Sequence, residues 1–189
     1  MANILNDRSV SDCQHFRQLS LVFTDAPCSE LLSQFANALN KNGHLPYTVK
    51  YEQLCNTPYV TLVHTDNHQL VAGGSIKHCD GILAEIGFMW VSKPYRRLGL
   101  AEYITQSRIA YAHKLGIKML YAKIRGDNVK SMNNLYKAGF RSAGNFLSQK
   151  DAYSTITWLY LPLQALSYNQ CCQLLQKKLV DLIPVIGQS

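Results

Sequence analysis

The sequence lacks the features of a membrane or exported protein. No uninterrupted apolar run of eighteen residues occurs anywhere in the 189-residue chain, and the N-terminal segment MANILNDRSVSD has no basic stretch followed by an apolar one. We therefore expect no membrane-spanning segment, no membrane partner and a cytoplasmic location.

Patterned cysteines are also missing. The six cysteines stand at positions 13, 28, 55, 79, 171 and 172, with no C-x-x-C pair and no Cys/His cluster at zinc spacing. We expect reduced thiols and no metal site.

Long runs of one charge are absent, although the formal net charge is +7 from 19 Lys and Arg against 12 Asp and Glu. Most of these charges are typical of a solvated surface, and the surplus favours an anionic ligand. Because there is no basic stripe and no aromatic platform motif, nucleic acid is the least favoured partner.

The sequence contains no internal repeat, no low-complexity segment and no long linker, and 47% hydrophobic residues suffice for a packed core. We expect a single domain over residues 1–162 and a C-terminal helical extension over 163–189. The extension carries an amphipathic stripe of Leu174, Leu175, Leu179, Leu182 and Ile183, which predicts packing on the domain or at a homodimer interface.

Hydrophobic periodicity predicts a mixed order of strands and helices. Strands are expected over 16–23, 59–64, 69–77, 82–91, 118–124 and 153–161, and helices from Ser29 to a stop at Gly43, over 100–115 and over 131–137. Asp80-Gly81 is a strong hairpin signal. In the strand over 82–91, simple alternation would place Ile86, Phe88 and Trp90 on one face.

One turn carries the main chemical signal. The segment from Val91 to Ala101 reads V-S-K-P-Y-R-R-L-G-L-A and passes from a strand into a helix at Gly99. Glycine lets a ligand approach the backbone, and a helix N-terminus offers free amides and partial positive charge. With Arg96 and Arg97 beside it, the turn predicts a diphosphate site, although an ordinary turn with solvated arginines is the alternative.

This segment resembles motif A of the GNAT superfamily, R/Q-x-x-G-x-G/A, with Ala101 in place of the last glycine. A second resemblance lies downstream, where Asn128-x-x-Ser131 and Lys137-Ala138-Gly139-Phe140 match the asparagine, small polar residue and K-x-G-F ending of the same superfamily. The resemblance runs from about Val60 to Leu161.

The resemblance implies an α+β, GNAT-like fold, with a central mixed, mostly antiparallel sheet, a splayed strand pair and flanking helices. It implies acetyl-CoA as cosubstrate, with pantetheine lying in the splay. The implied cofactor-binding residues are Met89, Trp90, Val91, Arg96, Arg97, Leu98, Gly99, Leu100, Ala101, Asn128 and Ser131. Core packing for Trp90 and a turn role for Asn128 are the alternatives.

The resemblance also suggests a catalytic acid and base. Glu85 lies fourteen residues before Gly99, the spacing of the general base in histone-acetyltransferase-like members, and its apolar strand predicts a raised pKa. The alternatives are a partly exposed strand residue, or one paired with a nearby Lys or Arg. Tyr136 is the candidate acid, but Leu135 occupies the position of the family's tyrosine, about 100° away around a helix.

The expected function is therefore an N-acetyltransferase that acts on a primary amine of a small molecule or peptide by direct attack in a ternary complex. Two alternatives remain: an inactive acyl-CoA-binding sensor, and a GNAT enzyme that acts on aminoacyl-tRNA. The sequence alone does not identify the acceptor.

Overall fold

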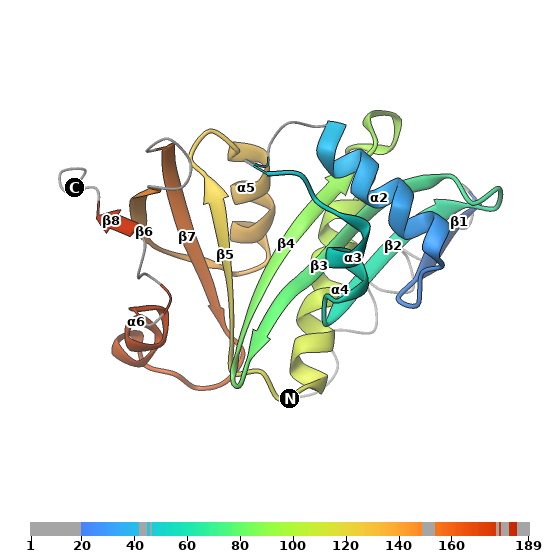
Figure 1. The fold of residues 1–189 in the computed structure, drawn as a ribbon. Helices are drawn as coiled ribbons and strands as arrows, with labels where there is room; N and C mark the ends of the chain where they lie inside the picture. Colours follow the sequence, from blue (N-terminus) through green and yellow to red (C-terminus); the bar gives the residue numbers. More distant parts are fainter. Residues whose placement is uncertain are drawn as a thin grey trace.

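The fold is built on one mixed β-sheet. The computed structural model describes residues 20–41, 45, 47–148, 154–176, 178 and 182–184. The strands are β1 (Leu21–Thr24), β2 (Tyr59–Thr65), β3 (Leu70–Asp80), β4 (Leu83–Val91), β5 (Met119–Arg125), β6 (Arg141–Ser148), β7 (Ser154–Pro162) and β8 (Leu182–Pro184). Within this described part of the chain they form an eight-stranded sheet in the order β1-β2-β3-β4-β5-β7-β6-β8, and only the β4–β5 pair is parallel (Figure 1).

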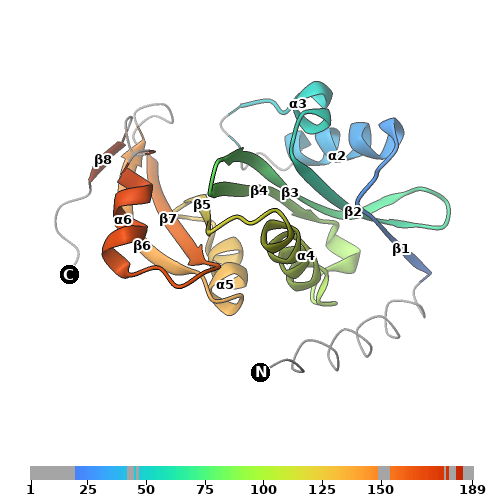
Figure 2. The same ribbon diagram turned by 90° about the horizontal axis from the view of Figure 1, so that it is seen from below.

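Helices cover both faces of the sheet. They are α2 (Ser29–Lys41), α3 (Tyr51–Cys55), the 3-10 helix η1 (Lys93–Tyr95), α4 (Leu100–Lys114), α5 (Val129–Lys137) and α6 (Tyr168–Gln176). Figure 2 shows α2 and α3 on one side of the sheet and α4 and α5 on the other. None of the helices in the described residues is both long and apolar enough to cross a bilayer.

The helices follow from apolar stripes that match the sheet below them. In α2, the residues Leu31, Phe35 and Leu39 recur at helical spacing and are buried against β2, β3 and β4. The strands between the two helical layers are covered on both faces, so Leu62 and Ala72 are fully buried.

The strands β4 and β5 separate soon after they begin. Their pairing starts with Leu83 opposite Met119 and ends with Glu85 opposite Tyr121. Both strands continue beyond this last pair, and no ladder joins their continuations. The predicted GNAT fold with its splayed strand pair is confirmed.

A β-bulge lies in β4 at the edge of this splay. Ser75 of β3 pairs with Gly87, while Gly73, two residues earlier, pairs with Trp90, three residues later. The strand β4 therefore holds one extra residue here, and Phe88 has a positive φ of 51°. A bulge of this kind bends the strand and increases its local twist.

The bulge overturns the prediction that Ile86, Phe88 and Trp90 share one face. Ile86 packs in the core on the α4 and α5 side. Phe88 and Trp90 pack against α2 on the opposite side. One inserted residue reverses the alternation of every side chain that follows it.

The remaining elements agree with the predictions except for α3, η1, β6 and β8, which were not expected. Leu182 and Ile183 lie in strand β8, paired with β6, where a helical stripe was predicted. Pairing with the free edge of β6 accounts for this difference, because it satisfies backbone groups that a helix would leave exposed on the strand. The predicted strand residues 16–19 and Tyr153, the predicted helix stop at Gly43, and Leu179 lie outside the described residues.

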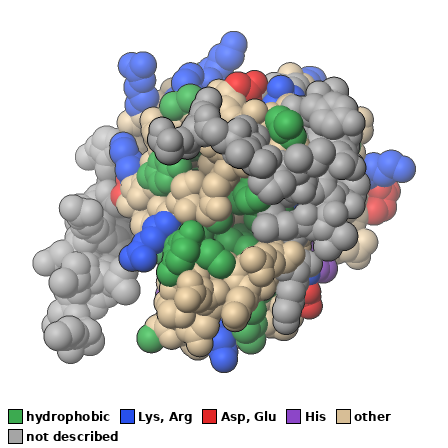
Figure 3. Space-filling model, turned by 90° about the vertical axis from the view of Figure 1, so that its left-hand side faces the viewer, with side chains coloured by type: hydrophobic (Ala, Val, Ile, Leu, Met, Phe, Trp, Pro, Cys, Tyr) green, Lys and Arg blue, Asp and Glu red, His purple; other side chains and the backbone are tan. Residues whose placement is uncertain are grey.

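The C-terminal helix α6 packs on the chain's own sheet. Cys171 and Leu175 are buried against Tyr121 and Trp158 on the side of the sheet that α2 also covers. Beside α6 lies a hollow of about 730 Å³, lined by Ile82, Lys118, Leu166, Gln170, Gln173, Leu174 and Gln176. Figure 3 looks onto this end of the molecule, where hydrophobic side chains gather near the centre and basic ones lie toward the rim.

Candidate functional site

The turn between β4 and α4 has a backbone conformation that suits an anion. Gly99 caps α4 with a φ of 83°, and Arg97 also lies in the left-handed region with a φ of 67°. Such a conformation costs a non-glycine residue about 1–3 kcal/mol and recurs at ligand sites. The first helical bond runs from the Tyr103 amide to the Gly99 carbonyl at 3.0 Å, and no side chain among the described residues caps this end. The amides of Leu100 and Ala101 therefore remain open to an anion.

The side chains of this turn are placed around that backbone. Arg96 is exposed, and its Nε donates to the Val91 carbonyl at 3.1 Å, which holds the guanidinium at the end of β4. Leu100 is buried and anchors the start of α4, while Leu98 is half-buried. The predicted cofactor residues from Arg96 to Ala101 thus lie together in one turn and the start of α4, and their binding role stays a prediction.

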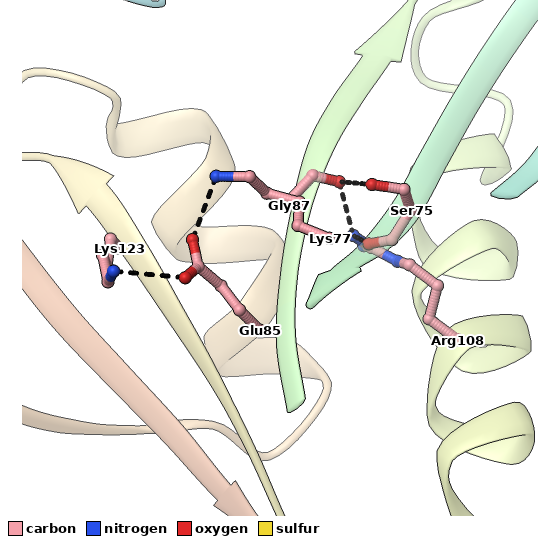
Figure 4. A network of polar contacts seen from close by, with 6 residues as sticks. All are labelled: Ser75, Lys77, Glu85, Gly87, Arg108 and Lys123. Carbon is pink, nitrogen blue, oxygen red and sulfur yellow. Dashed lines mark hydrogen bonds and ion pairs between the residues drawn. The ribbon is translucent and has the colours of Figure 1, made fainter. Parts of the chain in front are cut away.

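A cluster of three charges lies at the base of the splay. Glu85, the last paired residue of β4, is 8% exposed. Its Oε1 lies 3.0 Å from Lys77 Nζ of β3, and its Oε2 lies 3.1 Å from Lys123 Nζ of β5 (Figure 4). The carboxylate thus joins the two strands on either side of β4 at the point where β4 and β5 part.

The pKa of Glu85 differs from the prediction. Burial raises the pKa, but the charges of Lys77 and Lys123 outweigh burial, and the net pKa is lowered. For Lys77, burial lowers the pKa and Glu85 raises it, with a net increase. The expectation of a raised carboxyl pKa is wrong because the sequence does not reveal the two lysines, and pairing with Lys is the arrangement that the structure shows. The catalytic role of Glu85 stays a prediction.

Lys77 reaches Glu85 across a glycine. A Cβ at Gly87 would lie 2.3 Å from the Cδ of Lys77, so the absence of a side chain there makes room for the lysine stem. The Lys77 ammonium also lies 4.9 Å from the centroid of the Phe88 ring and 5.9 Å from that of Tyr47. These are cation–π contacts.

Lys123 rests on a second pair of aromatic rings. Its ammonium lies 5.0 Å from the Trp158 ring centroid and 5.7 Å from that of Tyr121, and the two rings stack at 5.6 Å with 5° between their planes. Trp158 is 1% exposed, and its buried Nε1 has no hydrogen-bond partner among the described residues. A buried donor of this kind calls for an explanation.

On the opposite side of the sheet, a buried arginine supports the bulge. Arg108 of α4 donates from NH1 to the carbonyls of Gly87 (3.3 Å) and Ser75 (3.5 Å), and from NH2 to Thr105 Oγ1 (2.9 Å). Figure 4 shows the Gly87 carbonyl receiving both Arg108 and the Ser75 hydroxyl. Burial lowers the pKa of Arg108 to about 9, so the side chain is still a cation at neutral pH.

This support extends to α5. Asn134 Nδ2 donates to Thr105 Oγ1 at 2.8 Å, and that hydroxyl donates to the Ala101 carbonyl at 2.8 Å. Because Arg108 bonds the same hydroxyl, one chain of hydrogen bonds connects α5, the first turn of α4 and the bulge in β4.

The strand residues predicted to contact pantetheine divide between the two faces. Met89 and Val91 pack toward α4, and Trp90 packs toward α2. Downstream, Asn128 caps α5, since its Oδ1 accepts from the Ser131 amide at 3.3 Å. The alternative predicted for Asn128 was a turn role, and a helix cap was not foreseen; contact of Asn128 and Ser131 with cofactor stays a prediction.

The candidate acid lies on the outer side of α5. Leu135 is 4% exposed and packs in the core, whereas its neighbour Tyr136 is 44% exposed. Leu135 and Tyr136 therefore point in different directions, as their positions one residue apart on the helix predicted. Nothing in the geometry of Tyr136 marks it as a catalytic acid, and the role stays a prediction.

A cationic hollow of about 540 Å³ lies between α2 and the start of the turn. Its lining includes Lys41, Lys93 and Arg96, together with Trp90 and Asn37. Within the described residues none of these three cations forms a salt bridge. No group of three His, Cys, Asp or Glu side chains in the same residues is placed to hold a metal ion.

The chain belongs to the acetyltransferase (GNAT) family, whose model matches residues 28–140. It is an acyltransferase, and the family uses acetyl-CoA and acts on amine acceptors. No curated protein matches the sequence closely enough to be counted as a relative.

Solved structures share the fold at low sequence identity. An N-acetyltransferase from Staphylococcus aureus Mu50 superposes with a TM-score of 0.63 at 16% identity over 76% of this chain and 99% of that chain. The ribosomal-protein-S18-alanine N-acetyltransferase from Escherichia coli gives 0.61 at 14%, over 79% and 97%. The yncA protein from Salmonella typhimurium, solved with its cofactor acetyl-CoA, gives 0.60 at 15%, over 81% and 99%. These likenesses support the fold alone.

Sequence reasoning missed the partners of Glu85 and the role of Arg108. Lys77 and Lys123 lie on different strands, and only the sheet order brings them together. Arg108 did carry a signal, because it is a charged residue within the apolar stripe of a helix, where an arginine is buried only when its donors find acceptors.

Proposed function

We propose that the protein is an N-acetyltransferase that moves the acetyl group of acetyl-CoA to a primary amine of a small molecule or peptide, by direct attack within a ternary complex. The proposal rests on two features of strand β4, its separation from β5 and its connection to the N-terminus of α4. The strand β4 leaves β5 after Glu85, and at its far end it leads into the uncapped N-terminus of α4.

The two features fit the two parts of coenzyme A. The amides of α4 and the cations of Arg96 and Arg97 suit a diphosphate. The unpaired edges of β4 and β5 suit an extended amide-containing arm, which can bond a strand edge as an added strand does. The Arg108 network fixes the bulge that directs β4 away from β5, and so keeps that edge open.

In the proposed reaction, the uncharged amine attacks the thioester carbonyl, an N–C bond forms and the C–S bond breaks. The amine nitrogen loses one proton and the departing thiolate gains one. We propose that Glu85 accepts the amine's proton, directly or through water. Its lowered pKa keeps it in the ionised form that a base requires, but also makes it a weak base. No titration of Glu85 should therefore appear in the rate between pH 6 and 9, and the rate should rise with pH as the amine loses its charge.

The test is turnover of acetyl-CoA, followed as free thiol, with a panel of small amines and peptides. We expect thiol release to depend on the amine, and CoA affinity to fall about tenfold or more when Arg96→Gln and Arg97→Gln are combined. Lys114→Gln is the control, because it removes one positive charge at the opposite end of α4, and each single arginine variant is compared with it. A protein that binds CoA but releases no thiol with any amine would contradict the proposal.

A further inference from the structure

The charge cluster at the base of the splay holds more donors than acceptors. Each lysine ammonium carries three N–H donors, and among the described residues the carboxylate of Glu85 is the only anion within ion-pair distance of Lys77 or Lys123. Two cations against one anion leave the cluster with a surplus of one positive charge. The two lysine side chains are 26% and 39% exposed, so solvent and ligands can reach them.

The aromatic rings of the cluster do not offer a seat for a ligand cation. A ligand ammonium would bind over ring faces, but Lys77 already lies over Phe88 and Tyr47, and Lys123 over Trp158 and Tyr121. The protein's own cations fill the positions that would recognise a polyamine. A bare cationic acceptor would also be repelled by the surplus charge.

The neutral groups of the cluster are donors too. The Trp158 indole N–H is buried beside Lys123 and bonds nothing in the described part of the chain. Burial and the negative charge of Glu85 raise the pKa of Tyr121, so its phenol stays protonated and adds no negative charge. Neither group gives a ligand cation an acceptor, and the exposed donors are those of the two ammonium groups, which an acceptor group complements, and best an anionic one.

We propose that the amine acceptor carries a carboxylate or phosphate group a few atoms from its nitrogen, and that Lys77 and Lys123 bind this anion at the base of the splay. The inference rests on the proposed function and names its substrate class. The acceptor's anion lies against the free donors of the two ammonium groups, which places the neighbouring amine beside Glu85. Amino acids and amino phosphates have this chemistry.

Matched acceptor pairs test the proposal. Each amino acid is compared with its own carboxamide, and phosphoethanolamine with ethanolamine, so the two arms distinguish carboxylate from phosphate. Because the members of a pair differ in amine pKa, kcat/KM is expressed per uncharged amine. We expect the wild-type protein to favour the anionic member of at least one pair about tenfold in kcat/KM, with the preference falling as salt is added. Equal rates within both pairs, or a preference for the neutral members, would overturn the proposal.

Variants of Lys77 and Lys123 show whether these lysines cause the preference for the anionic acceptor. Lys123→Gln and Lys77→Gln should each lower the ratio between paired acceptors about tenfold without changing the KM for acetyl-CoA. Lys123→Arg keeps the charge and should keep the preference, and Lys114→Gln on the far end of α4 should not alter it. A ratio that is unchanged in both glutamine variants refutes the assignment.

The proposed function and this inference fail differently. If CoA binds and no amine releases thiol, the function is wrong, and the affinity of each acceptor pair for the CoA complex, measured by calorimetry, still decides whether the anion is preferred. If neutral amines are acetylated as fast as anionic ones, the function stands and the inference is wrong.

Discussion

A methyl group added at Gly87 should break the ion pair between Lys77 and Glu85. The new Cβ would lie 2.3 Å from the Cδ of Lys77 and 3.1 Å from its Cγ, closer than side-chain atoms tolerate. Gly87 is not among the residues with positive φ, so alanine suits its backbone. The flexible lysine stem therefore moves, and its ammonium loses the 3.0 Å contact with the carboxylate.

The expected cost of Gly87→Ala is modest. Two unit charges 3.0 Å apart attract by about 5 kcal/mol at an effective dielectric constant of about 20. Much of this is offset because the displaced ammonium regains water, which leaves about 1–2 kcal/mol. The alanine also restricts the unfolded chain and returns about 0.4–1 kcal/mol. We expect a net loss of about 1 kcal/mol in the free energy of unfolding, and a higher pKa for Glu85.

A double-mutant cycle with Lys77→Ala isolates this effect. Urea unfolding gives the free energy of each variant, and Gly87→Ala should become neutral or stabilising once the lysine stem is gone. The coupling between the two positions should be about 1–2 kcal/mol, the amount attributed to the lost ion pair. If Gly87→Ala costs as much in the Lys77→Ala background as alone, the methyl acts through some other contact and the reasoning is refuted.

Three further changes probe the same region. Because the folded-state pKa of Glu85 is lowered, its contribution to stability is present above its ordinary pKa and is lost as the pH falls through the folded value. Glu85→Gln should cost about 2 kcal/mol at pH 7 by urea unfolding, and the difference from wild type should shrink as the pH falls below the ordinary pKa of the carboxyl group. Arg108→Met removes the arginine's hydrogen bonds to the Gly87 and Ser75 carbonyls and should cost about 2–4 kcal/mol and weaken CoA binding, whereas Lys114→Met on the exposed part of the same helix should do neither. Asn128→Ala removes the cap of α5 and should lower stability by about 1 kcal/mol, measured by thermal or urea unfolding, and unchanged CoA affinity in that variant would show that the side chain is a cap and nothing more.

The order of helices and strands could be predicted from the sequence where turn and cap residues mark the ends of the elements. Gly99 and Gly116 occupy left-handed positions at the two ends of α4, as a glycine before and after a helical stripe indicates. Asp80-Gly81 likewise joins β3 to β4. Elements without such residues at their ends were missed. The helix α3 has only five residues, and β8 is a strand because it pairs with β6.

The chemistry of the site could be predicted only in part, because it depends on contacts between strands. The spacing of Glu85 from Gly99 marked the residue, but Lys77 and Lys123, which lower its pKa, come from strands on either side of it. The bulge at Phe88 was also invisible, since β-bulges have no fixed residue signature, and it reversed the faces assigned to the end of β4.

The short ladder between β4 and β5 has a mechanical meaning as well. Strand β4 pairs with β3, and strand β5 pairs with β7, along longer ladders than the one between β4 and β5. The sheet therefore consists of two well-paired halves that are joined by three residue pairs. The ion pair between Glu85 and Lys123 spans this seam. A ligand that bonds the edges of both strands would add hydrogen bonds across this seam. When the ligand leaves, the backbones of β4 and β5 are joined only by the three residue pairs.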